Sequence, residues 1–594
     1  MKDFLKFTLA TITGLIVMGI IGIILTVIFF VQAVATQETS SGISNNTVLV
    51  IKLSGTITER TEDNPLASIL GSSLTDNNSV EDIVKAVNHA KENDKVKGIY
   101  IEAGTLVSAT PAALEEIRSA LADFRKSKKF IVAYGDNYTQ GTYYLSSVAD
   151  SVIINPSGTL AWMGMSSQVV YYRNLLDKLG VKMQVFKVGT YKSAVEPYIL
   201  DAMSDVNREQ ITTFENEIWG KFMKQVSESR GITAERLNAL TDSCLVFSEA
   251  ETYKKAQLVD RLAYADEVPD VIAHMMSVES QDDYHTASVT ELANAESCTP
   301  KDDSGNIIAV YYATGEIVDE MASGLASDEI VGTTVIKDLK ALAADDDVKA
   351  VVLRVNSPGG SAYASEQIWH QVQTVKEKKP VIVSMGGYAA SGGYYISCGA
   401  DWIVAEPTTL TGSIGIFGMF PEASELLTEK IGLKYETVKT NEFADFGDYS
   451  RPFNDNEKAK LQAYINNGYE LFTKRCADGR HISQDSIKAI GEGRVWTGMH
   501  AKQIGLVDQL GGLADAIAVA KKKAGVKECT IMTAPVKASF ITSLLEKAED
   551  ESYAKFHVRE LLGDFYPLFK TVSNLHFNKL NLQAQLPYYL KFNL

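Results

Sequence analysis

Residues 383–410 read VSMGGYAASGGYYISCGADWIVAEPTTL, and residues 132–160 read VAYGDNYTQGTYYLSSVADSVIINPSGTL. Each stretch begins with an apolar segment that enters a glycine, continues through small and aromatic residues, and ends in a second apolar segment. Asp150 pairs with Asp401 and Pro156 with Pro407, each at a separation of 251 residues. Such self-similarity at a fixed offset indicates that one half of the chain is written twice.

Three further pairs of segments extend the repeat outward in the same order. The pairs are 46–59 with 306–320, 83–102 with 335–354, and 246–262 with 495–512. The second pair resembles an amphipathic helix followed by a buried strand, and the others contain short strands with glycine turns. Strands that alternate with helices indicate crossover units, so the sequence predicts two α/β domains.

The repeat and its flanks divide the chain into five parts. The predicted boundaries are 1–45 for the N-terminus and membrane anchor, 46–276 for the first α/β domain, 277–305 for a polar linker, 306–534 for the second domain, and 535–594 for an amphipathic helical tail.

Composition excludes several classes of function. The 594 residues are 45% hydrophobic and 22% charged, which is typical of a folded globular protein. The formal net charge of -17 argues against a general nucleic-acid binder, because such proteins need a broad basic face. The sequence has no HExxH, paired CxxC or GxxxxGK[ST] motif. Its five scattered cysteines predict no disulfide framework.

The N-terminus predicts a membrane anchor. Phe7 to Gln37 contains no ionisable side chain and is long enough to span a bilayer. A cleaved secretory signal has a shorter apolar core, so we expect the segment to be retained, although Ala33-Val34-Ala35 also fits a small-residue cleavage site. Lys2 and Lys6 precede the span, and this charge asymmetry places the N-terminus in the cytoplasm and the domains on the other side of the membrane.

Two glycine-rich turns in the second half are candidates for chemistry. In the first, residues 356–361 (NSPGGS) follow an apolar strand, and the adjacent Gly359 and Gly360 suit an oxyanion hole or any tight strand-to-helix turn. In the second, Ser391 lies between Ala390 and Gly392 after another apolar strand. Its hydroxyl fits either a nucleophile or a helix N-cap, and this segment alone does not distinguish the two.

Comparison of the two copies favours the nucleophile. At the position equivalent to Ser391 the first half has Gln140, and at the position equivalent to Lys192 the second half has Phe443. The first copy therefore retains a lysine without a serine, and the second a serine without a lysine. This complementary loss predicts one composite site, with Ser391 as nucleophile and Lys192 as general base.

A lysine acts as a base only when it is neutral, so its pKa must fall from about 10.4 towards neutrality. Apolar neighbours such as Val188 and Val195 favour that shift. Glu196 opposes it, since at i+4 on a helix it would pair with Lys192 and keep the amine protonated. Ser413, which lies 22 residues after Ser391, is a further candidate whose hydroxyl would orient the amine. It equally fits a polar turn.

These motifs together resemble signal peptide peptidase A in its long, duplicated form, a membrane-bound family of Gram-negative bacteria. The resemblance covers nearly the whole chain from the anchor to about Gly525. Its most specific parts are NSPGGSAYASEQIW (356–369), GGYAASGGYYISCGAD (386–401), TGSIGIFG (411–418), VGTYKSAVEPY (188–198) and GRVWTGMHAKQIGLVDQLGG (493–512).

The resemblance implies a Clp-protease/crotonase-like α/β fold in tandem, preceded by one transmembrane helix. It implies a Ser391/Lys192 dyad with Ser413 near the lysine and an oxyanion hole from Gly359, Gly360 and Gly392. It further implies a homotetrameric bowl in the bacterial inner membrane, with periplasmic catalytic domains that cut remnant signal peptides without a metal or cofactor.

Two other classes of function remain open from the sequence. One is a crotonase-type acyl-CoA enzyme, because that fold also holds an enolate oxygen with paired glycine turns. The other is a catalytically silent membrane scaffold. The sequence also leaves open whether Lys192 and Ser391 meet within one chain or across subunits.

Overall fold

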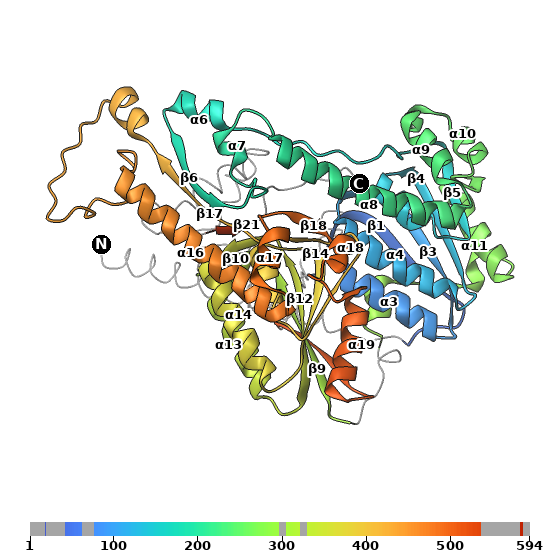
Figure 1. The fold of residues 1–594 in the computed structure, drawn as a ribbon. Coiled ribbons are helices and arrows are strands. Elements are labelled where there is room, and N and C mark those ends of the chain that lie inside the picture. Colours follow the sequence, from blue (N-terminus) through green and yellow to red (C-terminus); the bar gives the residue numbers. More distant parts are fainter. Residues whose placement is uncertain are drawn as a thin grey trace, which may run out of the picture.

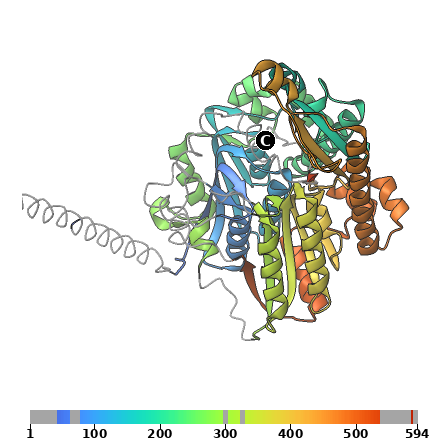
Figure 2. The same cartoon turned by 90° about the vertical axis from the view of Figure 1, so that its left-hand side faces the viewer.

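The computed structural model describes residue 18 and residues 42–61, 77–295, 304–320, 329–535 and 583–585. In these ranges the chain forms two α/β domains that pack side by side (Figure 1, Figure 2). No helix within them is both long and apolar enough to cross a membrane. The expected anchor, Phe7–Gln37, lies outside the described residues apart from Met18, as does most of the tail 535–594.

The first domain is built on a parallel seven-stranded sheet of order β2-β1-β3-β4-β5-β7, with β8 also paired to β1. Parallel neighbours need crossover connections, which the helices supply. The strands are β1 (Thr47–Thr58), β2 (Asn77–Ser79), β3 (Val96–Ser108), β4 (Phe130–Tyr138), β5 (Ser151–Leu160), β7 (Arg261–Leu262) and β8 (His285–Ser288). The helices are α3 (Val80–Glu92), α4 (Pro111–Arg125), α5 (Gln140–Ser146), α6 (Arg173–Leu179), α7 (Glu196–Ile199), α8 (Asp205–Arg230), α9 (Ala234–Asp242), α10 (Ala250–Lys255), α11 (Val268–Met276) and α12 (Val289–Ala293).

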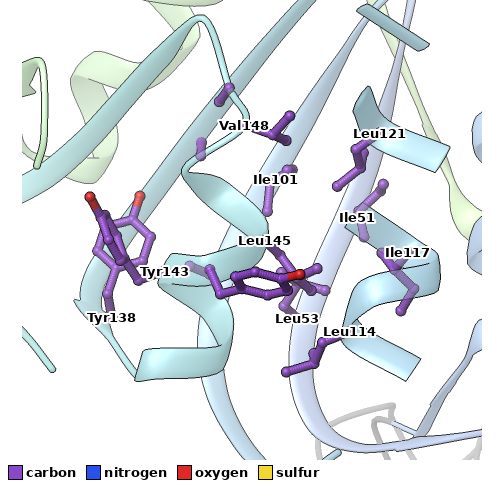
Figure 3. Close-up of a cluster of buried hydrophobic side chains, with 14 of the residues drawn as sticks. Ile51, Leu53, Ile101, Leu114, Ile117, Leu121, Tyr138, Tyr143, Leu145 and Val148 are labelled. Carbon is purple, nitrogen blue, oxygen red and sulfur yellow. The ribbon is translucent and has the colours of Figure 1, made fainter. Parts of the chain in front are cut away.

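One layer of the core of this domain lies between the sheet and α4. Leu114, Ile117 and Leu121 form the buried face of α4 at helical spacing. They face Ile51 and Ile101 on the two neighbouring central strands (Figure 3). The alternating pattern of the strands and the helical pattern of α4 therefore meet in one apolar layer.

The second domain repeats this plan in an eight-stranded sheet of order β18-β16-β14-β12-β9-β20, to which β15 and β19 are added beside β14. All its pairs are parallel except β16 with β18. The strands are β9 (Ile307–Thr314), β12 (Val348–Ser357), β14 (Val381–Ala390), β15 (Trp402–Ala405), β16 (Leu410–Gly412), β18 (Val495–Thr497), β19 (Gln509–Leu510) and β20 (Thr530–Ala534). The helices are α13 (Gly332–Ala344), α14 (Ala362–Lys376), α15 (Gly392–Ser397), α16 (Asp455–Arg480), α17 (Gln484–Ile490), α18 (Gly498–Gln503) and α19 (Leu513–Ala524).

The two copies retain matching aromatic packing. Tyr144 of α5 stacks on Phe222 of α8 with ring centroids 4.0 Å apart, and Tyr395 of α15 stacks on Phe472 of α16 at 4.3 Å. Helices α8 and α16 are each 26 residues long. The internal packing of the fold is therefore duplicated as well as its sequence.

The segment predicted as a linker, 277–305, is in part structured. Within it β8 pairs with β1, and α12 packs on α3, where Leu292 O lies 3.0 Å from the Nδ1 atom of His89. The interpretation of this segment as a plain joining region is corrected, because the first domain continues through at least Ala295.

A third, six-stranded sheet joins the two halves in the order β11-β10-β13-β21-β17-β6. Strand β6 of the first half pairs antiparallel with β17 over seven residue pairs, from Val188 opposite Ile416 to Lys182 opposite Glu422. These strands are β6 (Lys182–Val188), β10 (Glu316–Val318), β11 (Glu329–Val331), β13 (Gly359–Ser361), β17 (Ile416–Glu422) and β21 (Gln583–Gln585).

A buried ion cluster also connects the two domains. Arg354 of β12 is 1% exposed; its Nε donates to Glu59 at 2.8 Å and its Nη2 to Glu116 of α4 at 2.7 Å. Its third nitrogen donates to Ser384 Oγ at 2.9 Å. Both carboxylates belong to the first domain, and the guanidinium belongs to the second. The charged groups that one domain buries are therefore neutralised by the other domain.

We expect Arg354→Met to destabilise the protein by about 3–5 kcal/mol, because it leaves two buried carboxylates without their cation. Lys52→Met is the matched control, since the Lys52–Glu102 pair is exposed and its loss should cost at most about 1 kcal/mol. Urea unfolding curves of the three proteins measure both effects. Equal destabilisation by the two substitutions would contradict the assigned role of Arg354.

Candidate active site

Ser391 occupies the junction between β14 and α15 in a strained backbone conformation. Its φ is 56° and its ψ is -112°, and its side chain makes no capping hydrogen bond to α15. A non-glycine residue with positive φ costs about 1–3 kcal/mol, so the surrounding structure must hold it there. Its amide donates to Gly412 O at 2.8 Å. The helix-cap interpretation is therefore wrong, and the geometry resembles a nucleophile turn.

Lys192 and Ser391 meet within one chain. Lys192 Nζ lies 2.7 Å from Ser391 Oγ, 3.0 Å from Ser413 Oγ and 3.1 Å from Ser413 O. All three residues are fully buried. The structure thus brings together the three polar side chains that the sequence singled out. Lys192 comes from the first half of the repeat, and Ser391 and Ser413 come from the second.

Burial controls the charge of the amine. It holds the pKa of Lys192 well below its ordinary value, because the ammonium form loses its hydration and gains no carboxylate in exchange. A neutral amine has two N–H groups and one lone pair. The two oxygens of Ser413 can accept the N–H groups while the lone pair accepts the proton of Ser391, so the three contacts match the needs of a neutral lysine.

The segment that carries Lys192 is held by a residue that sequence reasoning missed. Glu492 accepts hydrogen bonds from the amide of Thr190 at 2.9 Å and from its hydroxyl at 2.7 Å, and its carbonyl accepts from the Tyr191 amide at 2.8 Å. Glu492 belongs to the second domain, just before β18. No local pattern connects it with Lys192, because the two are 300 residues apart in the sequence.

Two glycines allow this segment to approach the second domain closely. A Cβ on Gly493 would lie 2.7 Å from Lys192 N and 2.8 Å from its Cα, and one on Gly415 would lie 3.2 Å from Lys192 Cδ. Contacts under 3.0 Å with backbone atoms are not tolerated, so a side chain at position 493 would displace Lys192.

Glu196 does not pair with Lys192, contrary to the expectation from their spacing of four residues. Lys192 lies in a turn before α7, which begins at Glu196, so the two are not one helical turn apart. The Glu196 carboxylate instead accepts from Ser204 Oγ at 2.6 Å and from Asn207 Nδ2 at 3.2 Å. These contacts direct its charge away from the Lys192 amine.

Of the three glycines expected at an oxyanion hole, Gly359 lies against Gly392, which follows Ser391, whereas a Cβ on Gly360 would face the backbone of Ile317. Gly359 has φ 104° and Gly360 has φ 153°, conformations that favour glycine. A Cβ on Gly359 would lie 2.8 Å from the amide nitrogen of Gly392, so the backbones of Gly359 and Gly392 approach each other closely. The Gly359 amide itself donates to Ser357 Oγ at 3.2 Å.

The equivalent position in the first domain has a structural role. Gln140 is 4% exposed, and its side-chain oxygen accepts from the amides of Met163 and Gly164 at 3.0 and 2.9 Å. Its Nε2 donates to Gly164 O at 3.1 Å. The amide therefore fixes a loop where the second domain has its hydroxyl.

Comparison with known proteins identifies the family to which the chain belongs. The model of peptidase family S49 matches residues 123–279 and 373–527, once in each half, and the Clp protease model matches residues 318–405. A solved structure of a mutant ClpP1 from Listeria monocytogenes covers 35% of this chain and 94% of its own at 17% identity, with a TM-score of 0.24.

Relatives of similar length carry protease names. Protease 4 of Salmonella typhi is 37% identical over 510 residues, which cover 83% of this chain and 80% of the relative. Protease 4 of Haemophilus influenzae is 33% identical over 86% of this chain and 84% of its own length. The chloroplastic serine protease SPPA of Arabidopsis thaliana is 30% identical over 82% and 70%.

The duplicated Clp-protease-like α/β domains and these relatives define a serine peptidase. The chain belongs to peptidase family S49. The predicted tandem fold and the resemblance to signal peptide peptidase A are thereby confirmed. A crotonase-type acyl-CoA enzyme and a catalytically silent scaffold are no longer needed to explain the sequence.

We expect Gly493→Ala to lower kcat/KM for peptide hydrolysis about 100-fold, because the new Cβ would displace Lys192 from Ser391, and a displacement of about 1 Å at a reacting site costs about 100-fold in rate. Gly525→Ala is the matched control. Gly525 also has positive φ (70° against 76°), but a Cβ there meets nothing within 4 Å. Both substitutions carry the same kind of backbone strain, so an equal loss of activity would exclude the steric explanation.

Proposed function

We propose that this protein is a membrane-anchored serine endopeptidase in which Ser391 is the nucleophile and Lys192 the general base. The 2.7 Å contact between Lys192 Nζ and Ser391 Oγ, in a fully buried setting, carries the proposal. A serine hydroxyl is a weak nucleophile until an adjacent base removes its proton, and a neutral lysine in an apolar site meets that need.

The reaction would run through an acyl-enzyme. Lys192 takes the proton of Ser391 as Oγ attacks the peptide carbonyl, then returns it to the leaving amine, and later activates the water that hydrolyses the ester. Backbone amides near Gly359, Gly360 and Gly392 would stabilise the oxyanion. Ser413 would orient the amine through its two oxygens. The mechanism needs no metal and no organic cofactor.

We assign hydrophobic peptides as substrates, above all signal peptides left in the membrane after secretion. A relative from Enterococcus faecium, 34% identical over 231 residues, carries the name putative signal peptide peptidase SppA.

The apolar stretch Phe7–Gln37 supports an anchor in the bacterial inner membrane with periplasmic catalytic domains. Retention of the full chain in carbonate-washed membranes, lost on deletion of residues 1–45, tests the anchor.

A homotetramer is the assembly that we propose. The chain between β17 and α16 projects away from the body (Figure 1). It exposes large apolar side chains that a neighbouring subunit would cover. They are Ile431 at 58%, Leu433 at 45%, Val438 at 100% and Phe443 at 40% exposure.

We expect Ser391→Ala and Lys192→Ala each to lower kcat for hydrolysis of a hydrophobic peptide by at least about 10³-fold, because nucleophile and base act as a unit. Lys182→Ala, on the exposed edge of β6, is the control and should keep the wild-type rate. A fluorophosphonate should label Ser391 only while Lys192 is intact. Full activity of Lys192→Ala near neutral pH would overturn the dyad.

The pH dependence has a defined sign. Because burial lowers the pKa of Lys192, the amine is protonated and inactive below that pKa and neutral and active above it. We expect kcat/KM to rise with pH through this depressed pKa and level off well before the ordinary lysine range near 10.4. A flat profile between about pH 6 and 9 would exclude a titrating base in that window.

A further inference from the structure

Gln210 is a buried glutamine whose side chain contacts both halves of the active site. It lies on α8, the long helix of the first domain, where α8 contacts β18 of the second domain (Figure 1). The residue is 1% exposed. A side-chain amide is costly to bury unless its donors and its acceptor find partners, so the partners of Gln210 indicate what it holds in place.

The amide nitrogen of Gln210 holds the segment that carries the proposed base. Its Nε2 donates to Tyr191 O at 3.2 Å and to Ser193 Oγ at 3.4 Å, and a third acceptor, Asn207 Oδ1, lies at 3.1 Å. The Ser193 hydroxyl in turn donates to Tyr191 O at 3.2 Å. Tyr191 and Ser193 are the two chain neighbours of Lys192. Gln210 therefore fixes the chain on both sides of the lysine.

The amide oxygen of Gln210 holds the strand that positions the two serines. Its Oε1 accepts from the amide of Val495 in β18 at 3.2 Å. Val495 is paired with the β16 residue whose carbonyl accepts from the Ser391 amide at 2.8 Å. The preceding residue, Arg494, accepts from the Ser413 amide at 2.7 Å through its carbonyl. One side chain thus connects the base segment with the strand that supports Ser391 and Ser413.

The second copy of the fold has no counterpart to this glutamine. Helices α8 and α16 are equally long, and their stacked aromatic residues, Phe222 and Phe472, fix the alignment of the two helices. Gln210 then matches Lys460, which is exposed. The buried amide therefore occurs in the copy that supplies Lys192, where two segments need a polar connection.

From these contacts we propose that Gln210 is a positioning residue for the peptidase reaction, which sets the separation between Lys192 Nζ and Ser391 Oγ through its hydrogen bonds on either side of Lys192 and to Val495. The proposal rests on the proposed roles of Lys192 and Ser391. A lysine side chain is a flexible four-carbon stem, so its 2.7 Å contact with the serine depends on a fixed backbone. Gln210 acts through that backbone and not on the reacting atoms.

Loss of these hydrogen bonds should have two effects on the amine. When the Lys192 segment moves, the contact with Ser391 lengthens and proton transfer slows. Water also gains access to the amine, and hydration favours the ammonium form. The pKa of Lys192, which burial holds well below its ordinary value, then rises. The rise of kcat/KM with pH should therefore move to higher pH.

The test compares Gln210→Met with the wild type in the full chain, because methionine has nearly the same length but no amide. We expect kcat for a hydrophobic peptide to fall on the order of 10- to 100-fold with little change in KM, and the midpoint of the kcat/KM profile to shift to higher pH. Gln371→Met is the matched control. Gln371 is a buried glutamine of α14 with no hydrogen bond to the Lys192 segment or to β18 among the described residues, so we expect wild-type values.

A second variant tests the same inference if Gln210→Met folds poorly. Gln210→Glu keeps an oxygen that can accept from Val495 but loses the amide donors, and its carboxylate favours the ammonium form of Lys192. We expect the same upward shift of the pH midpoint. Hydrogen exchange of the peptide that contains Val495 should be faster in Gln210→Met, because the Val495 amide loses its acceptor, and should stay closer to the wild type in Gln210→Glu.

The pH midpoint separates positioning from a purely structural role. Misfolded molecules would lower kcat and leave the midpoint unchanged, so a lower kcat with a wild-type midpoint in both Gln210 variants overturns the inference. An equal effect of Gln371→Met, or unchanged hydrogen exchange at Val495, overturns it as well. A flat profile of the wild type itself overturns the proposed role of Lys192 and the inference with it. A normal wild-type profile that the Gln210 variants share overturns the inference alone.

Discussion

The site depends on one constraint: a lysine next to a serine is useful only if the protein keeps it neutral. Water must be excluded from the amine and no carboxylate admitted, since either would favour the ammonium form. Lys192 meets both conditions, because it is fully buried and Glu196 is bound by Ser204 and Asn207. Neither domain encloses it alone. The lysine comes from the first half, and Ser391, Ser413 and Gly493 enclose it from the second.

This constraint explains what holds the two halves together. The antiparallel pair of strands β6 and β17 places the Lys192 segment against the second domain, and Glu492 then fixes the backbone of this segment. At the other side of the interface Arg354 binds two first-domain carboxylates in a fully buried cluster. Buried ion pairs contribute little to stability compared with apolar packing, but they strongly disfavour arrangements in which the charges are unpaired. A site shared between two domains benefits from such specificity.

The duplication of the fold allowed each copy to contribute a different residue to one site. Both copies keep the tyrosine stacked on the long helix, and these contacts preserve the fold. With the framework secured twice, Gln140 could replace the hydroxyl in one copy and fix the loop at Met163 and Gly164. Within the described ranges the third sheet occurs once and is not duplicated between the two halves. It combines strands of both halves and the C-terminal segment, and it runs directly past Ser391.

The sequence by itself determined the duplication and the α/β class, and it singled out Ser391, Lys192 and Ser413 as candidate site residues, because these follow from residue patterns and from positions compared between two copies. Only the tertiary structure decided that Lys192 and Ser391, 199 residues apart, meet in one chain. It alone revealed Glu492, Gly493 and the strand at Ala584. The physical reason is that strand pairing between distant segments and the exclusion of water from an amine are properties of the assembled surroundings, and no local period or composition records them.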